Sequence, residues 1–290
     1  MSFHLIGLQL GSEDDVLARA VEALDEVEPG ETAFLSESLA WTPEASGRAY
    51  ANLIALAQER DINIVTTLNL GGELIHDLPG HDPLERYACV AIFTRHGVAH
   101  IPQAKLTPQS FERDVERDEE LIAVARYERL NLVTLDMDDE LVRARFLACS
   151  DVAALTRFRP DELACDLLVV LGNFPLGAEK AAHRLLGTAL AHGVAESAVL
   201  VNGFHAPALG KAALAEHVEE VLDATPAHEP AAAWESPRSL RSAFFVYPDD
   251  EVTDFVSLAT HDKRRARIPV AESMWEAPVE LGSYPVTVVF

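Results

Sequence analysis

Lysine is scarce in this chain, and cysteine is scarcer still. Only four of its 290 residues are lysine, although lysine and arginine together number 23. The three cysteines, Cys89, Cys149 and Cys165, show no CxxC spacing. So small and odd a number of cysteines argues against a disulfide framework and against a zinc site. We therefore expect reduced thiols and no metal.

Long apolar runs are also missing. The longest, such as "DLLVVLGNF", fall well short of the 18 or more residues that a membrane-spanning helix requires. The first apolar segment, "FHLIGLQL", is short and lacks the basic start of a secretory signal. The sequence thus predicts a cytoplasmic protein without a membrane partner.

Positive charge is in deficit, since 47 acidic residues give a formal net charge of −24. Such a charge repels phosphate backbones and argues against a nucleic-acid partner. The hydrophobic content of 49% and the charged content of 24% are those of a globular protein with a full core. We expect residues 1–290 to form a single domain.

The hydrophobic pattern alternates between strands and helices, with hairpin-like strand pairs between them, which indicates a layered α/β fold with mixed sheets. A hairpin is predicted to turn at His96–Gly97. From about 206 to 240 the pattern loosens, and we expect an insertion or a rebuilt segment there. Helices are predicted over 12–27, 45–61, 159–164, 179–197 and 208–223, and strands over 3–10, 30–38, 62–70, 87–106, 130–137, 142–150, 165–173, 198–204, 242–252 (half of a hairpin) and 284–290.

Three residues that could carry chemistry lie where predicted strands end. Glu37 closes "AFLSES", Lys105 follows the hairpin in "AHIPQAKL", and Cys149 closes "VRARFLACS". Taken singly, each has an ordinary interpretation. A charged residue after an apolar run is usually a solvated strand end, and a cysteine there is usually part of the core. Their combination and their surroundings carry the functional hypothesis.

The order Glu37, Lys105, Cys149 resembles that of the nitrilase superfamily of carbon–nitrogen hydrolases. "IGLQL", "KLTPQSFER", "FLACSD" and "ACDLLVVLGNFP" are similar to stretches of that superfamily, and the resemblance covers about residues 4–204. It implies a four-layer α-β-β-α sandwich with mixed β-sheets, assembly into a homodimer or a higher homo-oligomer, and no cofactor. "KLTPQSFER" also implies a role in the site for a second glutamate, Glu112.

The triad makes chemical sense apart from the resemblance. An adjacent cation stabilises the thiolate of a cysteine, so Lys105 can activate Cys149 and then hold the negative atom that forms on attack. Glu37 can take the thiol proton and later activate water. Glu112 can orient Lys105 or the substrate, and the backbone N–H of Ser150 can help to bind an oxyanion. An ammonium is a compact point charge, and the hypothesis that chemistry needs one here would explain a lysine in an arginine-rich chain; the alternative is that lysine survives here by chance.

Several departures from the superfamily pattern leave the function open between two classes. Ser36 stands where proline is usual, and Ser150 stands where tryptophan or tyrosine is common. The segments 115–124 and 201–207 also differ. The first hypothesis is hydrolysis of a small carboxamide, carbamoyl compound or nitrile through a Cys149 thioester, with an amidase favoured over a nitrilase. The second is a nitrilase-fold binding or regulatory protein whose catalytic site has degraded.

Other polar and aromatic residues give weaker signals. Trp41, Asn173 and Phe174 come just after predicted strand ends, where they could line a substrate pocket or simply pack. Two histidines and two aspartates in "IHDLPGHD" (75–82) could suggest a metal, but two histidines five residues apart in a polar loop are poor evidence for one.

Overall fold

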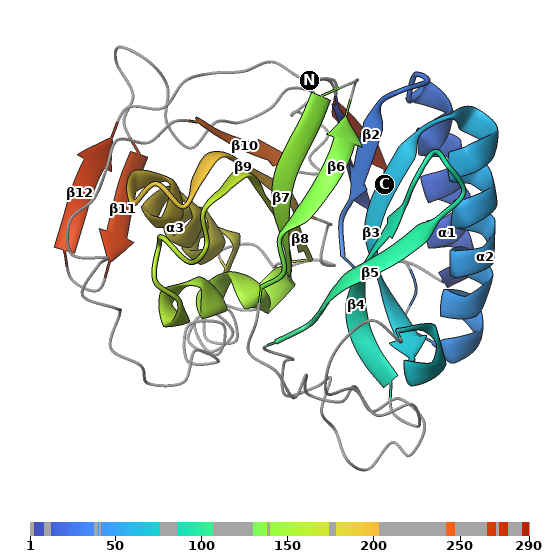
Figure 1. The fold of residues 1–290 in the computed structure, drawn as a ribbon, viewed down its shortest axis with the longest axis horizontal. Coiled ribbons are helices and arrows are strands. Elements are labelled where there is room, and N and C mark those ends of the chain that lie inside the picture. Colours follow the sequence, from blue (N-terminus) through green and yellow to red (C-terminus); the bar gives the residue numbers. More distant parts are fainter. Residues whose placement is uncertain are drawn as a thin grey trace.

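Two β-sheets lie face to face, and helices cover the outer face of each (Figure 1). The layers run α-β-β-α, with α1 and α2 on one side and α3 on the other. The predicted four-layer sandwich with mixed sheets is therefore confirmed. The computed structural model of the protein describes residues 3–8, 13–37, 40, 42–75, 86–106, 130–137, 140–173, 178–202, 242–246, 266–270, 273–277 and 286–289.

The first sheet has the strand order β13-β1-β2-β3-β4-β5. Strands β13, β1, β2 and β3 run parallel, whereas β4 and β5 are antiparallel to their neighbours. The carboxyl ends of β2 and β5 therefore lie at the same edge of the sheet. The strands are β1 (Phe3–Leu8), β2 (Thr32–Leu35), β3 (Asn63–Gly71), β4 (Arg86–Phe93), β5 (Ala99–Ala104) and β13 (Val286–Val289).

The second sheet has the order β10-β9-β8-β7-β6. Strands β7 to β10 are parallel, and β6 pairs with β7 in the antiparallel direction. A separate hairpin joins β11 (Ala266–Val270) to β12 (Ser273–Ala277). The strands of the second sheet are β6 (Val133–Met137), β7 (Glu140–Ala148), β8 (Cys165–Gly172), β9 (Ala195–Asn202) and β10 (Ser242–Val246).

Local sequence signals set the helix ends. The hydroxyl of Thr42 accepts the backbone N–H of Ala45 at 3.3 Å, and Pro43 opens α2, since a first-turn proline sacrifices no helical hydrogen bond. Asp61 ends α2 in the left-handed conformation, with φ of 56°. The helices are α1 (Glu13–Ala23), α2 (Pro43–Arg60), α3 (Ala178–Ala191) and the 3-10 helices η1 (Leu24–Glu26), η2 (Gly72–Leu74) and η4 (Cys149–Arg157).

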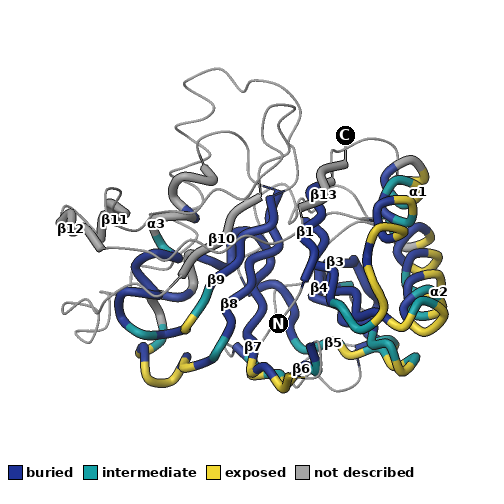
Figure 2. Tube along the Cα trace, turned by 90° about the horizontal axis from the view of Figure 1, so that it is seen from above, coloured by how far each residue is buried: buried dark blue, intermediate teal, exposed yellow. Residues whose placement is uncertain are grey.

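An apolar layer fills the space between the two sheets. Phe34 of the first sheet packs edge-on against Phe3 and also lies 6.5 Å, centroid to centroid, from Phe146 of the second sheet. Each large side chain buried in this way contributes roughly 1.5–3 kcal/mol. Figure 2 shows the strands of both sheets as the buried part of the molecule, while exposed positions lie on α1 and α2 and on turns at the ends of strands.

The structure corrects several details of the sequence-based expectations. The expected helix over 159–164 is a pair of hydrogen-bonded turns, and the helical segment is η4, directly before it. The helix expected over 179–197 ends at Ala191, because Gly193 turns the chain with φ of 72° and β9 follows. Strand β10 runs parallel to β9, and no hairpin partner for it lies among the described residues. The expected segment over 206–240 lies outside the described residues.

Candidate active site

Glu37 lies just beyond the carboxyl end of β2. The preceding Ser36 donates its backbone N–H to Ile6 O of β1 at 3.0 Å and so continues the sheet by one residue. Glu37 then leaves the first sheet and donates its backbone N–H to Gly172 O of β8 at 3.2 Å. The glutamate is thus fastened to the second sheet through its own backbone.

Lys105 lies just beyond β5, at the same edge. Its backbone N–H donates to Ala88 O at 2.7 Å, and its Nζ donates to Glu37 Oε1 at 2.8 Å. The lysine is 1% exposed and the glutamate 8% exposed, so the pair is buried. A buried charge is tolerated only when a partner and hydrogen bonds compensate for its lost hydration. Each of the two residues therefore requires the other.

Cys149 marks the point where β7 passes into η4. Its φ is 45°, in the left-handed region that residues with a Cβ rarely adopt, at a cost of order 1–3 kcal/mol. The thiol lies close enough to Glu37, to Lys105 and to the backbone N–H of Asn173 for all three to act on its pKa. The structure therefore brings Glu37, Lys105 and Cys149 together, as the sequence predicts.

Burial raises the pKa of the Cys149 thiol well above its ordinary value of 9.0, and the negative charge of Glu37 raises it further. Lys105 and the N–H of Asn173 act in the opposite direction, because both stabilise the thiolate. The two raising effects win. The resting site consequently holds a neutral thiol next to a carboxylate that can take its proton.

Asp151 is a site residue that the sequence reasoning missed. It is fully buried two residues after the cysteine. Its Oδ1 accepts the backbone N–H of Leu106 at 2.8 Å, and its Oδ2 accepts that of Ala148 at 3.4 Å. One signal could have found it. An acidic residue at the third position of a helix, followed by apolar Val152 and Leu155, is typical of an N-terminal cap.

The remaining expected site residues divide into two groups. Ser150 is fully buried in the first turn of η4, and Asn173, 6% exposed, follows β8 beside the thiol. Asn173 Oδ1 is buried and has no hydrogen-bond partner within the described part of the chain. Trp41, Glu112 and Phe174 lie outside the described residues, as do the histidines and aspartates of 76–82.

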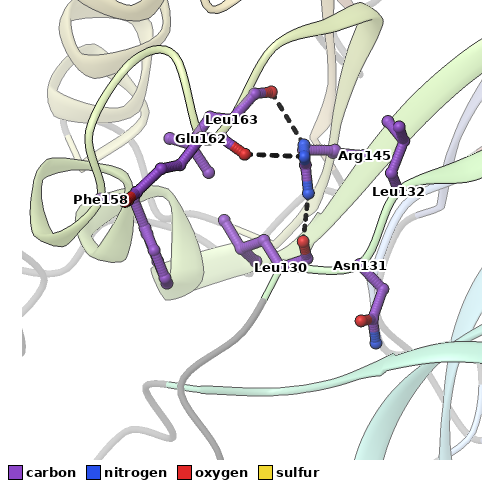
Figure 3. Close-up of a pocket in the computed structure, with 7 residues that line it drawn as sticks. All are labelled: Leu130, Asn131, Leu132, Arg145, Phe158, Glu162 and Leu163. Carbon is purple, nitrogen blue, oxygen red and sulfur yellow. Dashed lines mark hydrogen bonds between the residues drawn. The ribbon is translucent and has the colours of Figure 1, made fainter.

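A cavity of about 740 Å³ lies farther back along β7 (Figure 3). Arg145 projects into its wall, where its guanidinium donates to the carbonyls of Leu130, Glu162 and Leu163. These bonds hold the turns after η4 and the segment before β6 against β7. None of Glu37, Lys105 and Cys149 lines this cavity, so we interpret Arg145 as a structural brace and not as a ligand site.

Two features are absent from the described residues. None of the described helices has both the length and the apolar character that a membrane span requires. No group of three or more histidine, cysteine, aspartate or glutamate side chains in the described ranges is arranged to hold a metal ion.

No protein-family model and no curated protein sequence matches this chain. Solved structures do. A mutant of an amidase of the nitrilase superfamily from Nesterenkonia is 14% identical, over 70% of this chain and 77% of that one, with a TM-score of 0.47. A CN-hydrolase superfamily protein from Xanthomonas campestris is 14% identical, over 68% and 75%, with a TM-score of 0.48. A carbon–nitrogen hydrolase from Helicobacter pylori is 12% identical, over 70% and 73%, with a TM-score of 0.49.

Proposed function

We propose that this protein hydrolyses a carbon–nitrogen bond of a small carboxamide through a thioester on Cys149. The observation that carries the proposal is the buried cluster itself. A cysteine on a left-handed turn lies within electrostatic reach of a glutamate, and a lysine lies 2.8 Å from the same glutamate. A nucleophile next to a base that a third group orients is the arrangement of covalent catalysis.

Glu37 is the proton carrier in this mechanism. As Sγ attacks the carbonyl carbon, Glu37 takes the thiol proton, and the carbonyl π electrons move to its oxygen. Glu37 then gives the proton to the nitrogen, the carbon–nitrogen bond breaks, ammonia or an amine leaves, and a thioester remains. In the second half Glu37 takes a proton from water, the hydroxide displaces the thiolate, and the carboxylic acid is released as the thiol regains its proton.

Lys105 supplies the fixed positive charge. Its ammonium is held by Glu37 in a buried site, where electrostatic interactions are stronger than in water. We assign it to the oxyanion that forms on attack, together with the backbone N–H of Ser150 in the first turn of η4. Glu112 is proposed as a second carboxylate that orients Lys105 or the substrate, as the superfamily resemblance implies.

Asn173 favours an amide over a nitrile. Its buried Oδ1 accepts no hydrogen bond from the described residues, and a buried acceptor without a donor is costly. The –NH2 group of a carboxamide can donate to it, whereas a nitrile nitrogen has no proton to donate. We expect Asn173→Leu to raise KM for amides, with a smaller effect on nitriles, and comparing the two KM ratios tests this.

Ammonia release from a panel of small amides, ureido acids and nitriles tests the function. We expect release from amides by the wild-type protein and none by Cys149→Ala. The matched control is Cys165→Ala, which removes another buried thiol and should leave the rate unchanged. Equal release by wild type and Cys149→Ala would contradict the covalent mechanism. No release from any compound, with binding of one of them in a thermal-shift assay, would favour the non-catalytic binding protein.

A further inference from the structure

Asp151 joins the two sheets where the proposed catalytic residues meet. It belongs to the second sheet's side of the site, in η4, directly after β7. The backbone N–H that its Oδ1 accepts belongs to Leu106, beyond β5 of the first sheet. In Figure 1, β5 runs toward the point where β7 passes into this short helix. One carboxylate therefore binds the segment after the lysine to the segment around the cysteine.

The two acceptor oxygens act on the immediate neighbours of both residues. Leu106 directly follows Lys105, and Ala148 directly precedes Cys149. The packing between the sheets at large is apolar and therefore non-directional. Hydrogen bonds to a carboxylate, by contrast, are directional and stronger than those between neutral groups.

We propose that Asp151 is a positioning residue, whose buried carboxylate holds Lys105 and Cys149 at the separation that thiolate and oxyanion stabilisation require. This inference rests on the proposed function, because it assigns Asp151 to the same site. The bond from Leu106 N–H to Asp151 Oδ1 is one of two hydrogen bonds described here that cross between the sheets. The other is the bond from Glu37 N–H to Gly172 O. One crossing bond places the base and the other places the lysine relative to the thiol.

Only a carboxylate can make both bonds. Asparagine has the same shape but one acceptor oxygen, so in Asp151→Asn an –NH2 group would face one of the two N–H donors. Asp151→Glu keeps both acceptors and moves them by one methylene. Asp166→Asn is the matched control, because Asp166 Oδ2 also accepts a backbone N–H, that of Arg143, at 2.9 Å, but at the opposite end of β8.

The first test is alkylation of Cys149 by iodoacetamide between pH 6 and 9, followed peptide by peptide in the folded protein. We expect Asp151→Asn to slow alkylation several-fold at every pH in this range, because the lysine is less well placed to stabilise the thiolate. The opposite sign would arise if the carboxylate acted only through its charge, since removing a negative charge favours the thiolate. Unchanged or faster alkylation would therefore overturn the proposal.

A double-mutant cycle shows whether Asp151 acts through Lys105. In a Lys105→Gln background, Asp151→Asn should slow alkylation by a smaller factor than in the wild type. An equal factor in the two backgrounds would overturn the proposal. If Asp151→Asn does not fold, Asp151→Glu takes its place in both experiments, with the same outcomes for and against. The control Asp166→Asn should leave the profile at Cys149 unchanged.

Turnover provides the second readout. With an amide substrate we expect Asp151→Asn to lower kcat about 10- to 100-fold with little change in KM, because misplacement by about 1 Å is enough for such a loss. Asp151→Glu should restore part of the rate. A variant that melts earlier but keeps wild-type kcat well below its melting temperature would show a merely structural role. The alkylation tests need no turnover, so a failure of the proposed function leaves this inference testable.

Discussion

The two ends of the second sheet contain similar residues in different settings. Each has a buried cysteine and an ion pair nearby. At the Cys165 end the pair is Arg143–Asp166, with side chains 54% and 31% exposed. At the Cys149 end it is Lys105–Glu37, with side chains 1% and 10% exposed. Burial, and not residue type, distinguishes a surface contact from a group of charges that can do chemistry.

The two thiols differ in what surrounds them. Burial raises the pKa of Cys165 to about 12, and its thiol donates to Val194 O at 3.6 Å, as an ordinary core cysteine does. Cys149 has the left-handed backbone, the glutamate and the lysine. A cysteine at a strand terminus is therefore informative only through its backbone conformation and its neighbours.

Of the substitutions considered, Glu37→Gln should have the largest effect on turnover. A glutamine cannot carry a proton, so we expect turnover to fall about 10²- to 10⁴-fold. Alkylation of Cys149 should instead become faster, because loss of the negative charge lowers the pKa of the thiol. Rates of ammonia release and of alkylation, measured on the same sample, check the two opposite signs. If both rates fell, Glu37 would not add to the effect of burial in keeping the thiol neutral.

Lys105→Arg should have the next largest effect on turnover. A guanidinium is planar and spreads its charge, so it cannot replace a compact ammonium in a site closed to 1% exposure. We expect kcat to fall about 10²- to 10³-fold, the usual loss when one oxyanion donor is removed. Arg143→Lys makes the reverse exchange in the exposed pair and should leave kcat unchanged. A Lys105→Arg variant with a near-normal rate would contradict the proposed role of the ammonium.

The pH dependence of alkylation should show a smaller difference, between the thiols of Cys149 and Cys165. Because the pKa of Cys149 is raised above 9.0, its reactive thiolate is a minor form at neutral pH. Its alkylation rate should therefore rise about tenfold per pH unit through pH 9 without levelling off. Cys165 should stay nearly unmodified over the same range. A plateau for Cys149 below pH 8 would show that Lys105 outweighs burial and Glu37.

Asp166→Asn should have the smallest effect, a slight change in the melting temperature. The hydrogen bond from Arg143 lowers the pKa of Asp166, so the pair stabilises the fold above the ordinary pKa of an aspartate and loses that effect as pH falls through the lowered pKa. Because the pair is largely exposed, solvent screens it, and we expect the melting temperature at pH 7 to change by only about 2 °C or less. Thermal melts at pH 7 and pH 3 should show the difference between variant and wild type shrinking at the lower pH.

Much of the site could be predicted because its residues follow strands with clear hydrophobic patterns. Glu37, Lys105 and Cys149 each follow such a run, and the strand ends of the two facing sheets bring them together. The positive φ of Cys149 could not be predicted, because neither alanine nor serine beside it signals a left-handed turn. Asp151 was missed because no helix was expected over Cys149–Arg157, so its place in a first helical turn went unseen, and its partners Leu106 and Ala148 contribute only backbone N–H groups.

The fold, like the site, has features that local sequence predicts and features that it does not. Strands and long helices follow from local periodicity, including the hairpin that turns at Gly97 with φ of 73°. The short helix expected over 159–164 is wrong, because Pro160 and the acidic residues after it also suit hydrogen-bonded turns. The direction of β10 depends on its pairing with β9, a long-range contact that local pattern does not encode.

The hydrogen bond from Glu37 N–H to Gly172 O has a consequence for how this protein loses its structure. The acid and the lysine come from one sheet and the thiol from the other, so neither sheet alone can hold the cluster. The reactivity of Cys149 therefore depends on the packing of the two sheets against each other. In rising urea it should drift toward that of a free cysteine as soon as the sheets separate, even while each sheet still keeps its strands.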